Sequence, residues 1–311
     1  MQAPQRRFSS TRSIRRRVCQ HAGLNIGRRW INALRFRPHN QAPGRAAVRP
    51  NFLATPDETL LSAFLPNSMT ENRFILRFHV AILVIVLLGF ARTFYMRDWI
   101  FNRPLNIGLQ LHGALLTAWF AVTSFQAYLI SSGRRNLHRQ IAWIACIIAL
   151  SVVLSASWIN TRLAMTLHSA AEPENILIWG NYLTLVAFTG LFLSAIQCRS
   201  NPQAHRRLIL FASIVIVGPA FARFAFWPIF NFGIGIAPIF SVGGILVLLA
   251  IGAAYDFLSL GKLHSATIAG IASVVLSIAV GVGIGVSGLG FGALNSLGIV
   301  TKIDLTIPAS H

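Results

Sequence analysis

Seven long apolar runs constrain the fold of this chain more than any other feature. They cover residues 74–95, 105–130, 140–165, 176–198, 208–230, 235–255 and 265–286, each bounded by charge, proline or glycine. A helix needs about 20 apolar residues to cross a bilayer, and in lipid only helices and closed barrels satisfy their backbone. The runs are too long and too uniformly apolar for barrel strands. We therefore predict an all-α, polytopic membrane bundle of about seven transmembrane helices.

Composition excludes a water-soluble globular protein. The chain is 54% hydrophobic and 11% charged, whereas soluble domains have about 25% charged residues. The net charge of +19 resembles that of a nucleic-acid binder, but twelve of the arginines lie in residues 1–68. The other basic residues are spread between the apolar runs. The expected partner is the lipid bilayer and not a nucleic acid.

Residues 1–68 contain no apolar run and are rich in arginine, proline, asparagine and serine, which predicts a disordered basic tail. Three interpretations stay open: an organellar transit peptide, a cytoplasmic tail that touches anionic lipid, or sequence upstream of a true start at Met69. We favour the last, because Met69 leads directly into the first apolar run. Residues 69–300 then form the membrane domain and residues 301–311 a short C-terminal tail.

The short loops predict an orientation. The loop at 131–139 contains three arginines, the next even-to-odd connection contains Arg199, Arg206 and Arg207, and the last contains Lys262. Because short cytoplasmic loops carry an excess of Lys and Arg, these loops are expected to be cytoplasmic. The N-terminus is then cytoplasmic and the C-terminus periplasmic. The arginines around the first outer loop, at 92, 97 and 103, oppose this orientation, whereas Glu172 and Glu174 support it.

A short His-Arg element recurs where spans begin: NLHRQI at 136–141 and QAHRRL at 203–208, with GKLH at 261–264 in similar style. Together with LQLHGALLTAW at 109–119 and YD at 255–256, these segments resemble a family of uncharacterised multi-pass bacterial inner-membrane proteins. They more distantly resemble a second membrane family of unknown function with paired LHR and HRR signatures. The resemblance covers roughly residues 70–288. It implies a seven-span protein of the bacterial inner membrane and no established activity.

Four histidines are predicted near the inner ends of odd-numbered spans: His79, His138, His205 and His264. If those spans are neighbours, the imidazoles converge and are suited to a metal ion or a haem, since neutral imidazole is a common nitrogen ligand. The alternative is that these residues are interfacial anchors. No His-x-x-x-His pair lies on one helix, and no carboxylate is expected beside them.

A second set is predicted near the outer ends of the spans: His112, Arg92, Arg162 and Arg223. An arginine within the membrane is costly unless it snorkels to the surface or meets an anion. Pro219, just before Arg223, frees a backbone carbonyl that needs a partner. These residues are candidates for binding a small anionic or quinone-like ligand. In the alternative, the arginines snorkel to headgroups and His112 bonds a neighbouring Ser or Thr.

The sequence has no Ser-His-Asp constellation, no HExxH, no paired carboxylates and no Cys-x-x-Cys, so no catalytic site is predicted. The glycines at 281, 283 and 285 and at 288, 290 and 292 indicate a close-packing helix face and not a phosphate loop. We therefore predict a small-ligand-binding, sensing or accessory membrane protein. The alternative is a membrane redox protein that binds haem or quinone through histidines, and the third possibility is a transporter.

Overall fold

A computed structural model describes residues 68–102, 104–230 and 233–300, and within these ranges every regular element is helical. The predicted tails at 1–67 and 301–311 lie outside the described residues. The helices are α4 (Ser68–Phe90), η1 (Ala91–Tyr95), α5 (Arg97–Phe101), α6 (Ile107–Ser131), α7 (Arg135–Ala164), α8 (Pro173–Gln197), α9 (Pro202–Val215), α10 (Gly218–Ala222), η2 (Arg223–Phe226), η3 (Ile234–Ile236), α11 (Ala237–Leu260), α12 (Ser265–Val286) and α13 (Leu289–Ser296).

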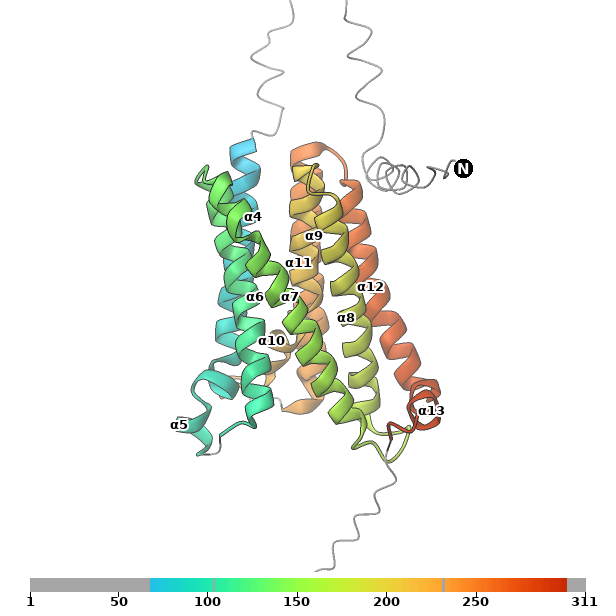
Figure 1. The fold of residues 1–311 in the computed structure, drawn as a ribbon. Coiled ribbons are helices and arrows are strands. Elements are labelled where there is room, and N and C mark those ends of the chain that lie inside the picture. Colours follow the sequence, from blue (N-terminus) through green and yellow to red (C-terminus); the bar gives the residue numbers. More distant parts are fainter. Residues whose placement is uncertain (1–67, 103, 231–232, 301–311) are drawn as a thin grey trace, which may run out of the picture. The chain divides into compact units, whose positions relative to one another are not determined.

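Seven of the helical segments are long and apolar enough to cross a membrane, which confirms the predicted fold class. They form an upright bundle in which α4 begins at the upper end, together with the α6–α7, α8–α9 and α11–α12 connections (Figure 1). The lower end carries α5, α10 and α13. We refer to these as the upper and lower ends throughout.

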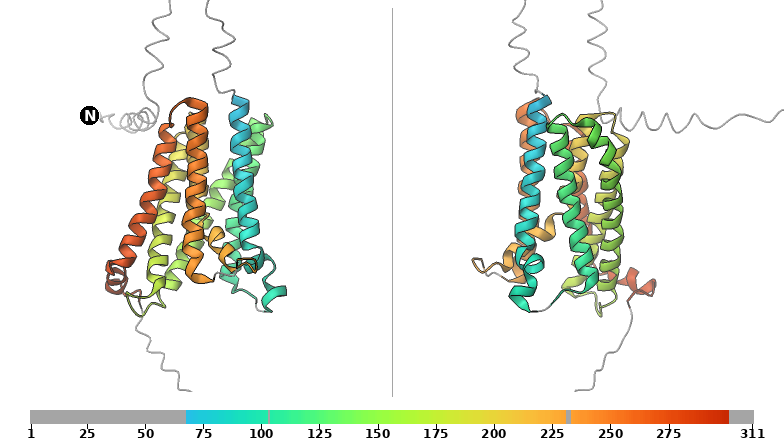
Figure 2. Two further views of the ribbon diagram at one scale, coloured as in Figure 1. Left: turned by 180° about the vertical axis from the view of Figure 1, so that it is seen from behind. Right: turned by 60° about the vertical axis from the view of Figure 1, so that its left-hand side comes forward.

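The fifth span, α9 followed by α10 and η2, is the centre of the bundle. Of its 18-residue apolar stretch, 61% is buried inside the bundle, against 11–33% of the same stretch in each of the other six spans. It contacts α4, α8, α11 and α12, while α6 packs between α4 and α7 and α7 packs mainly on α6 and α8 (Figures 1 and 2). The most central sequence segment is therefore the one that begins with the repeated His-Arg element.

Several helices begin or end a few residues away from the apolar runs. The sequence predicts that the third span begins at residue 140, whereas α7 begins at Arg135. It predicts that the fifth span begins at residue 208, whereas α9 begins at Pro202. Their first turns are polar because they stand at the bundle end, where Asn201 caps α9 by accepting from the Ala204 amide. The seventh, expected over 265–286, has those same bounds.

Proline breaks the fifth span. α9 ends at Val215, and Pro219 is the residue whose missing N–H would have bonded the Val215 carbonyl. A second short helix restarts at Gly218, and a Cβ at that position would lie 2.7 Å from the Ser241 hydroxyl. The break therefore seats α10 tightly against α11 and turns the following residues across the lower end.

Of the glycines predicted to form a close-packing face, those at 281, 285 and 290 lie against α8, whereas those at 283 and 292 have no atom within 4 Å of the position that a Cβ would take. A Cβ at Gly281 would lie 2.8 Å from the Gly180 Cα, and one at Gly285 would lie 2.6 Å from the Ile176 Cα. A Cβ at Gly290, on α13, would overlap the Trp179 ring. These glycines allow the two backbones to approach closely, as small residues do between membrane helices.

Candidate functional site

The four histidines proposed as ligands do not form one cluster. The spans that carry them are not all neighbours, because α7 packs mainly on α6 and α8. His79 lies eleven residues into α4, roughly 16 Å along the helix, whereas the other three stand at or near helix starts. Among the described residues no group of three or more His, Cys, Asp or Glu side chains is arranged to hold a metal ion.

Each histidine instead has its own surroundings. His79 donates from Nδ1 to the Ile75 carbonyl at 2.9 Å, and its buried Nε2 has no partner in the described part of the chain. His205 donates from Nδ1 to the Ala195 carbonyl at 2.8 Å, which leaves a lone pair on its Nε2. His138 lies close enough to His205 for their charges to interact. Of the four, only His138 and His205 are brought near each other.

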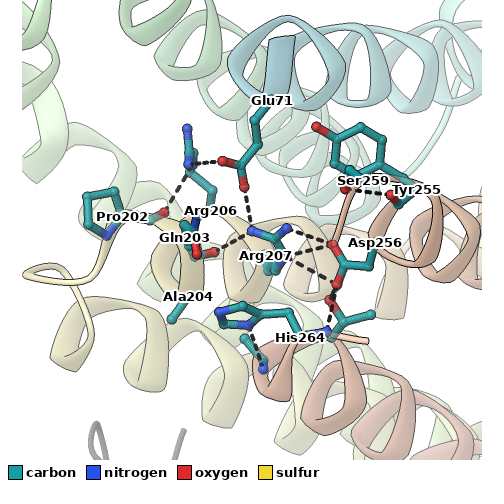
Figure 3. A network of polar contacts seen from close by, with 12 residues as sticks. Glu71, Pro202, Gln203, Ala204, Arg206, Arg207, Tyr255, Asp256, Ser259 and His264 are labelled. Carbon is teal, nitrogen blue, oxygen red and sulfur yellow. Dashed lines mark hydrogen bonds and ion pairs between the residues drawn. The ribbon is translucent and has the colours of Figure 1, made fainter. Parts of the chain in front are cut away.

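A buried network of charged residues, which the sequence analysis missed, joins four spans at the upper end (Figure 3). Arg207 donates to Asp256 through Nη2 at 2.6 Å and Nε at 3.0 Å, and through Nη1 to Glu71 at 2.5 Å. The other Glu71 oxygen accepts from Arg206 at 2.7 Å. Asp256 also accepts from the Thr267 hydroxyl and, at 3.1 Å, from the backbone N–H of His264.

Charge balance explains how this network is tolerated inside the bundle. Glu71, Arg207 and Asp256 are 4%, 3% and 1% exposed, and with Arg206 they make two cations against two anions. Buried charges are retained when they are paired and hydrogen-bonded. The network connects α4, α9, α11 and α12, so it acts as a neutral brace. It does not present a free charge to a ligand.

The network corrects our expectation that no carboxylate lies beside the histidines, because Asp256 bonds the backbone of His264. We also expected Arg206 and Arg207 to be loop charges, but both side chains point into the bundle (Figure 3). One signal was available in the sequence. Asp256 is an acidic residue directly after the sixth apolar run, and a charge at the membrane end of a span implies a partner.

His264 is the N-cap of α12 and serves as a structural residue. Its Nδ1 accepts from the Ala266 N–H at 3.0 Å, so that nitrogen is unprotonated and already occupied. Burial lowers the pKa of His264 below its usual value of 6.5, and the positive charge of Arg207 lowers it further. The cap and the nearby cation both favour the neutral imidazole.

At the lower end the structure brings Arg92 and Arg223 to one junction, between η1 and η2. Arg223 lies with its guanidinium carbon 4.4 Å from the centre of the Phe90 ring and donates from Nη1 to the Pro219 carbonyl at 2.9 Å. Arg92 donates from Nη1 to the Phe226 carbonyl at 2.8 Å. Both guanidinium groups are half-buried, and no described carboxylate lies within ion-pair distance of either.

His112 joins this junction from α6. Its Nδ1 lies 3.0 Å from the Ser155 hydroxyl, which donates its own proton to the Val152 carbonyl. Nδ1 then carries the imidazole proton, and Nε2 presents a lone pair with no partner among the described residues. Arg223 is close enough for its charge to act on His112, but no described hydrogen bond or ring contact joins the two side chains. The bond from His112 to a neighbouring serine, which the alternative interpretation predicts, is present.

Arg162 does not belong to this site. Its side chain is exposed at the end of α7 and stacks over the Trp158 ring at 5.9 Å, and no described contact joins it to Arg92, Arg223 or His112. The snorkelling interpretation fits this residue. We call Arg92, Arg223 and His112 the lower-end site.

The segments that carry the lower-end site are rich in aromatic side chains. Phe94 lies against Gly113, one residue beyond His112, where a Cβ would overlap its ring. Phe221, Phe224 and Trp227 form a chain of tilted contacts at 6.5 and 5.8 Å, and the Phe221 ring packs against Gly244 of α11. Two cations, an imidazole acceptor and flat apolar surfaces therefore lie together, and these groups suit a planar polar ligand.

No family model, curated protein or solved structure matches this chain.

Proposed function

We propose that this chain is a multi-pass membrane protein that binds a small anionic or quinone-like ligand at the lower-end site, in a ligand-binding, sensing or accessory role. The observation that carries the proposal is the pair of half-buried guanidinium groups, Arg92 and Arg223, with no described acidic partner. An arginine within a membrane span is a functional hypothesis by default, because its charge costs about 2.5–3.5 kcal/mol near the bilayer centre on insertion scales.

The contrast with the upper end supports this choice of site. There, Arg206 and Arg207 are neutralised by Glu71 and Asp256. At the lower end, the described contacts of Arg92 and Arg223 are with backbone carbonyls and aromatic faces. Such contacts orient a guanidinium without neutralising it, and each group keeps further N–H donors for a ligand.

The proposed ligand follows from the donors and acceptors available. Arg223 can donate two parallel hydrogen bonds to a carboxylate, or one to a quinone carbonyl. The lone pair on His112 Nε2 accepts from a ligand hydroxyl. The rings of Phe224 and Trp227 offer flat surfaces to a ring or an alkyl chain. A ligand with one polar head and an apolar body satisfies all three.

The experiment is to identify what the purified protein retains. Small molecules extracted from the detergent-purified chain are compared by mass spectrometry with those from Arg223→Gln and from Arg162→Gln. We expect a carboxylate or quinone present in the parent and in Arg162→Gln and lost from Arg223→Gln. The same retained species in all three proteins, or none in the parent, would remove the support for the site.

We further propose that the protein lies in a bacterial inner membrane, with the upper-end loops in the cytoplasm and the C-terminus in the periplasm. The support is the excess of arginine in the short upper-end connections and the resemblance carried by the His-Arg elements.

A redox role is a second candidate, favoured by one observation. His138 and His205 lie close enough for their charges to interact, and His205 donates from Nδ1 to the Ala195 carbonyl, which leaves a lone pair on its Nε2. Such a pair of imidazoles would suit axial ligation of a haem. A redox protein without haem would instead hold a quinone at the lower-end site. An absorption spectrum separates these candidates: a Soret band that is lost in His138→Ala supports haem, and its absence under ordinary haem supply rejects that candidate.

A further inference from the structure

The outer surface of the bundle has an open groove between α4 and α6, near the upper end. Its volume is about 610 Å³, within the range of about 300–1,000 Å³ typical of ligand pockets. The residues that line it are Leu76, Arg77, Val80, Ala81, Ser124, Phe125 and Tyr128. The groove therefore joins a mainly aliphatic and aromatic floor to one cation.

The cation is placed toward the headgroup side of this groove. Arg77 is exposed, and side chains on a helix lean toward its N-terminus, which for α4 is the upper end. Arg73, also exposed, lies one turn farther in that direction on the same face. Tyr128 stands three residues before the end of α6, roughly 5 Å from it, and because α6 runs upward its side chain leans down into the groove (Figure 1).

Neither arginine has an acidic partner within the described part of the chain. The one acidic residue on this part of α4, Glu71, is buried and occupied by Arg206 and Arg207. No described carboxylate lies within ion-pair distance of Arg73 or Arg77. Among the residues at 68–102, 104–230 and 233–300, the positive charge above this groove is thus uncompensated, and the groove would face the acyl chains of a bilayer.

We propose that this groove is a binding site for an anionic phospholipid, with one acyl chain against Val80, Ala81 and Phe125 and the phosphate on Arg77 and Arg73. The site is separate from the lower-end site and does not depend on it. Basic pockets between transmembrane helices bind lipid headgroups in this manner, and each basic residue near the surface contributes about 1 kcal/mol of attraction to anionic lipid. The groove adds apolar contacts to an acyl chain, which an arginine on a flat surface would not provide.

The experiment is native mass spectrometry of the detergent-purified protein with equal amounts of phosphatidylglycerol and phosphatidylcholine that carry the same acyl chains. We expect retention of phosphatidylglycerol over phosphatidylcholine. Arg77→Gln removes the charge, and Ala81→Phe fills the groove while leaving every arginine in place. Each should reduce retained phosphatidylglycerol at least fivefold, and Arg77→Lys should restore part of it.

Arg199→Gln is the matched control, an exposed upper-end arginine outside the groove lining. Its lipid retention should equal that of the parent. Both test residues are exposed, so folding is checked by an unchanged melting temperature. The proposal is overturned by equal retention of the two lipids. It is also overturned if Ala81→Phe keeps the parent's retention, since binding would then need only surface charge, or if Arg199→Gln loses as much lipid as Arg77→Gln.

Discussion

The guanidinium carbon of Arg223 lies 4.4 Å from the centre of the Phe90 ring, and two residues after Phe90 the Arg92 side chain reaches back to the Phe226 carbonyl. Each of the two segments therefore holds the arginine of the other. This reciprocal contact requires the backbones of α4 and α10 to lie very close. Gly89 permits that approach, because a Cβ there would overlap the carbonyl oxygen of Ala220.

The first prediction tests this approach. Gly89→Ala should destabilise the protein by about 1–3 kcal/mol, because the added methyl forces α4 and α10 apart. The measurement is chemical unfolding in detergent. Gly283→Ala is the control, since no atom lies within 4 Å of the position its Cβ would take. Equal stability of the two variants would show that the close approach is not needed.

A second prediction concerns the upper-end brace. Asp256→Ala leaves Arg207 with only Glu71 as an ionic partner, so part of a buried charge network is broken. Breaking such a pair costs about 3–5 kcal/mol. Glu174→Ala, at an exposed carboxylate, should change unfolding free energy by less than about 0.5 kcal/mol.

The double variant Arg207→Ala/Asp256→Ala completes a cycle with the two single variants. Because the two side chains are in direct contact, their coupling should fall within the range of about 0.5–3 kcal/mol seen for contacting residues. Additive single effects would contradict the described pairing.

The third prediction is a pH dependence at His264. Its pKa in the folded protein lies below 6.5, because burial and the Arg207 charge disfavour the imidazolium. The unfolded chain therefore binds this proton more strongly, so the contribution of His264 to stability is complete above pH 6.5 and is lost as pH falls from there toward the lower folded pKa. Unfolding in detergent between pH 8 and pH 5 measures it.

His264→Ser is the control for that measurement, because serine caps a helix without titrating. The difference in stability between the parent and His264→Ser should move in favour of the serine variant as pH falls. A difference that does not change with pH would contradict the assigned role of the imidazole.

Topology gives the fourth prediction. Reporter domains fused after Ser132 and after Lys262 should report the cytoplasm, and one fused after residue 300 should report the periplasm, because short loops rich in Lys and Arg stay inside. An alkaline phosphatase fusion that is active only when exported measures each position. Activity at Ser132 together with inactivity after residue 300 would reverse the proposed orientation.

The sequence predicts the seven spans well because hydropathy over about 20 residues reports a local requirement, the burial of backbone in lipid. The break in the fifth span is also local, since it depends on Pro219. The Glu71–Arg207–Asp256 network is different. Its members are separated by 136 and 49 residues, so only the packing of α4, α9 and α11 brings their charges together.

The candidate ligand residues show the same distinction. Arg162 and Arg223 are both arginines near the end of an odd-numbered span, and sequence position treats them alike. Packing separates them, because α7 turns Arg162 outward while the broken fifth span holds Arg223 against α4. The side on which a helix face lies is a tertiary property, and a single sequence does not contain it.

The most direct test of the central claim is the affinity of the lower-end site for two defined probes, a short-chain benzoquinone and decanoate, measured by isothermal titration of the detergent-purified chain. We predict saturable binding of at least one probe. Arg223→Lys should weaken it about tenfold, a loss of about 1.4 kcal/mol, because an ammonium lacks the planar fork of the guanidinium. Arg162→Gln should bind like the parent. Binding of neither probe, or equal affinity in the parent and Arg223→Lys, would contradict the proposed function.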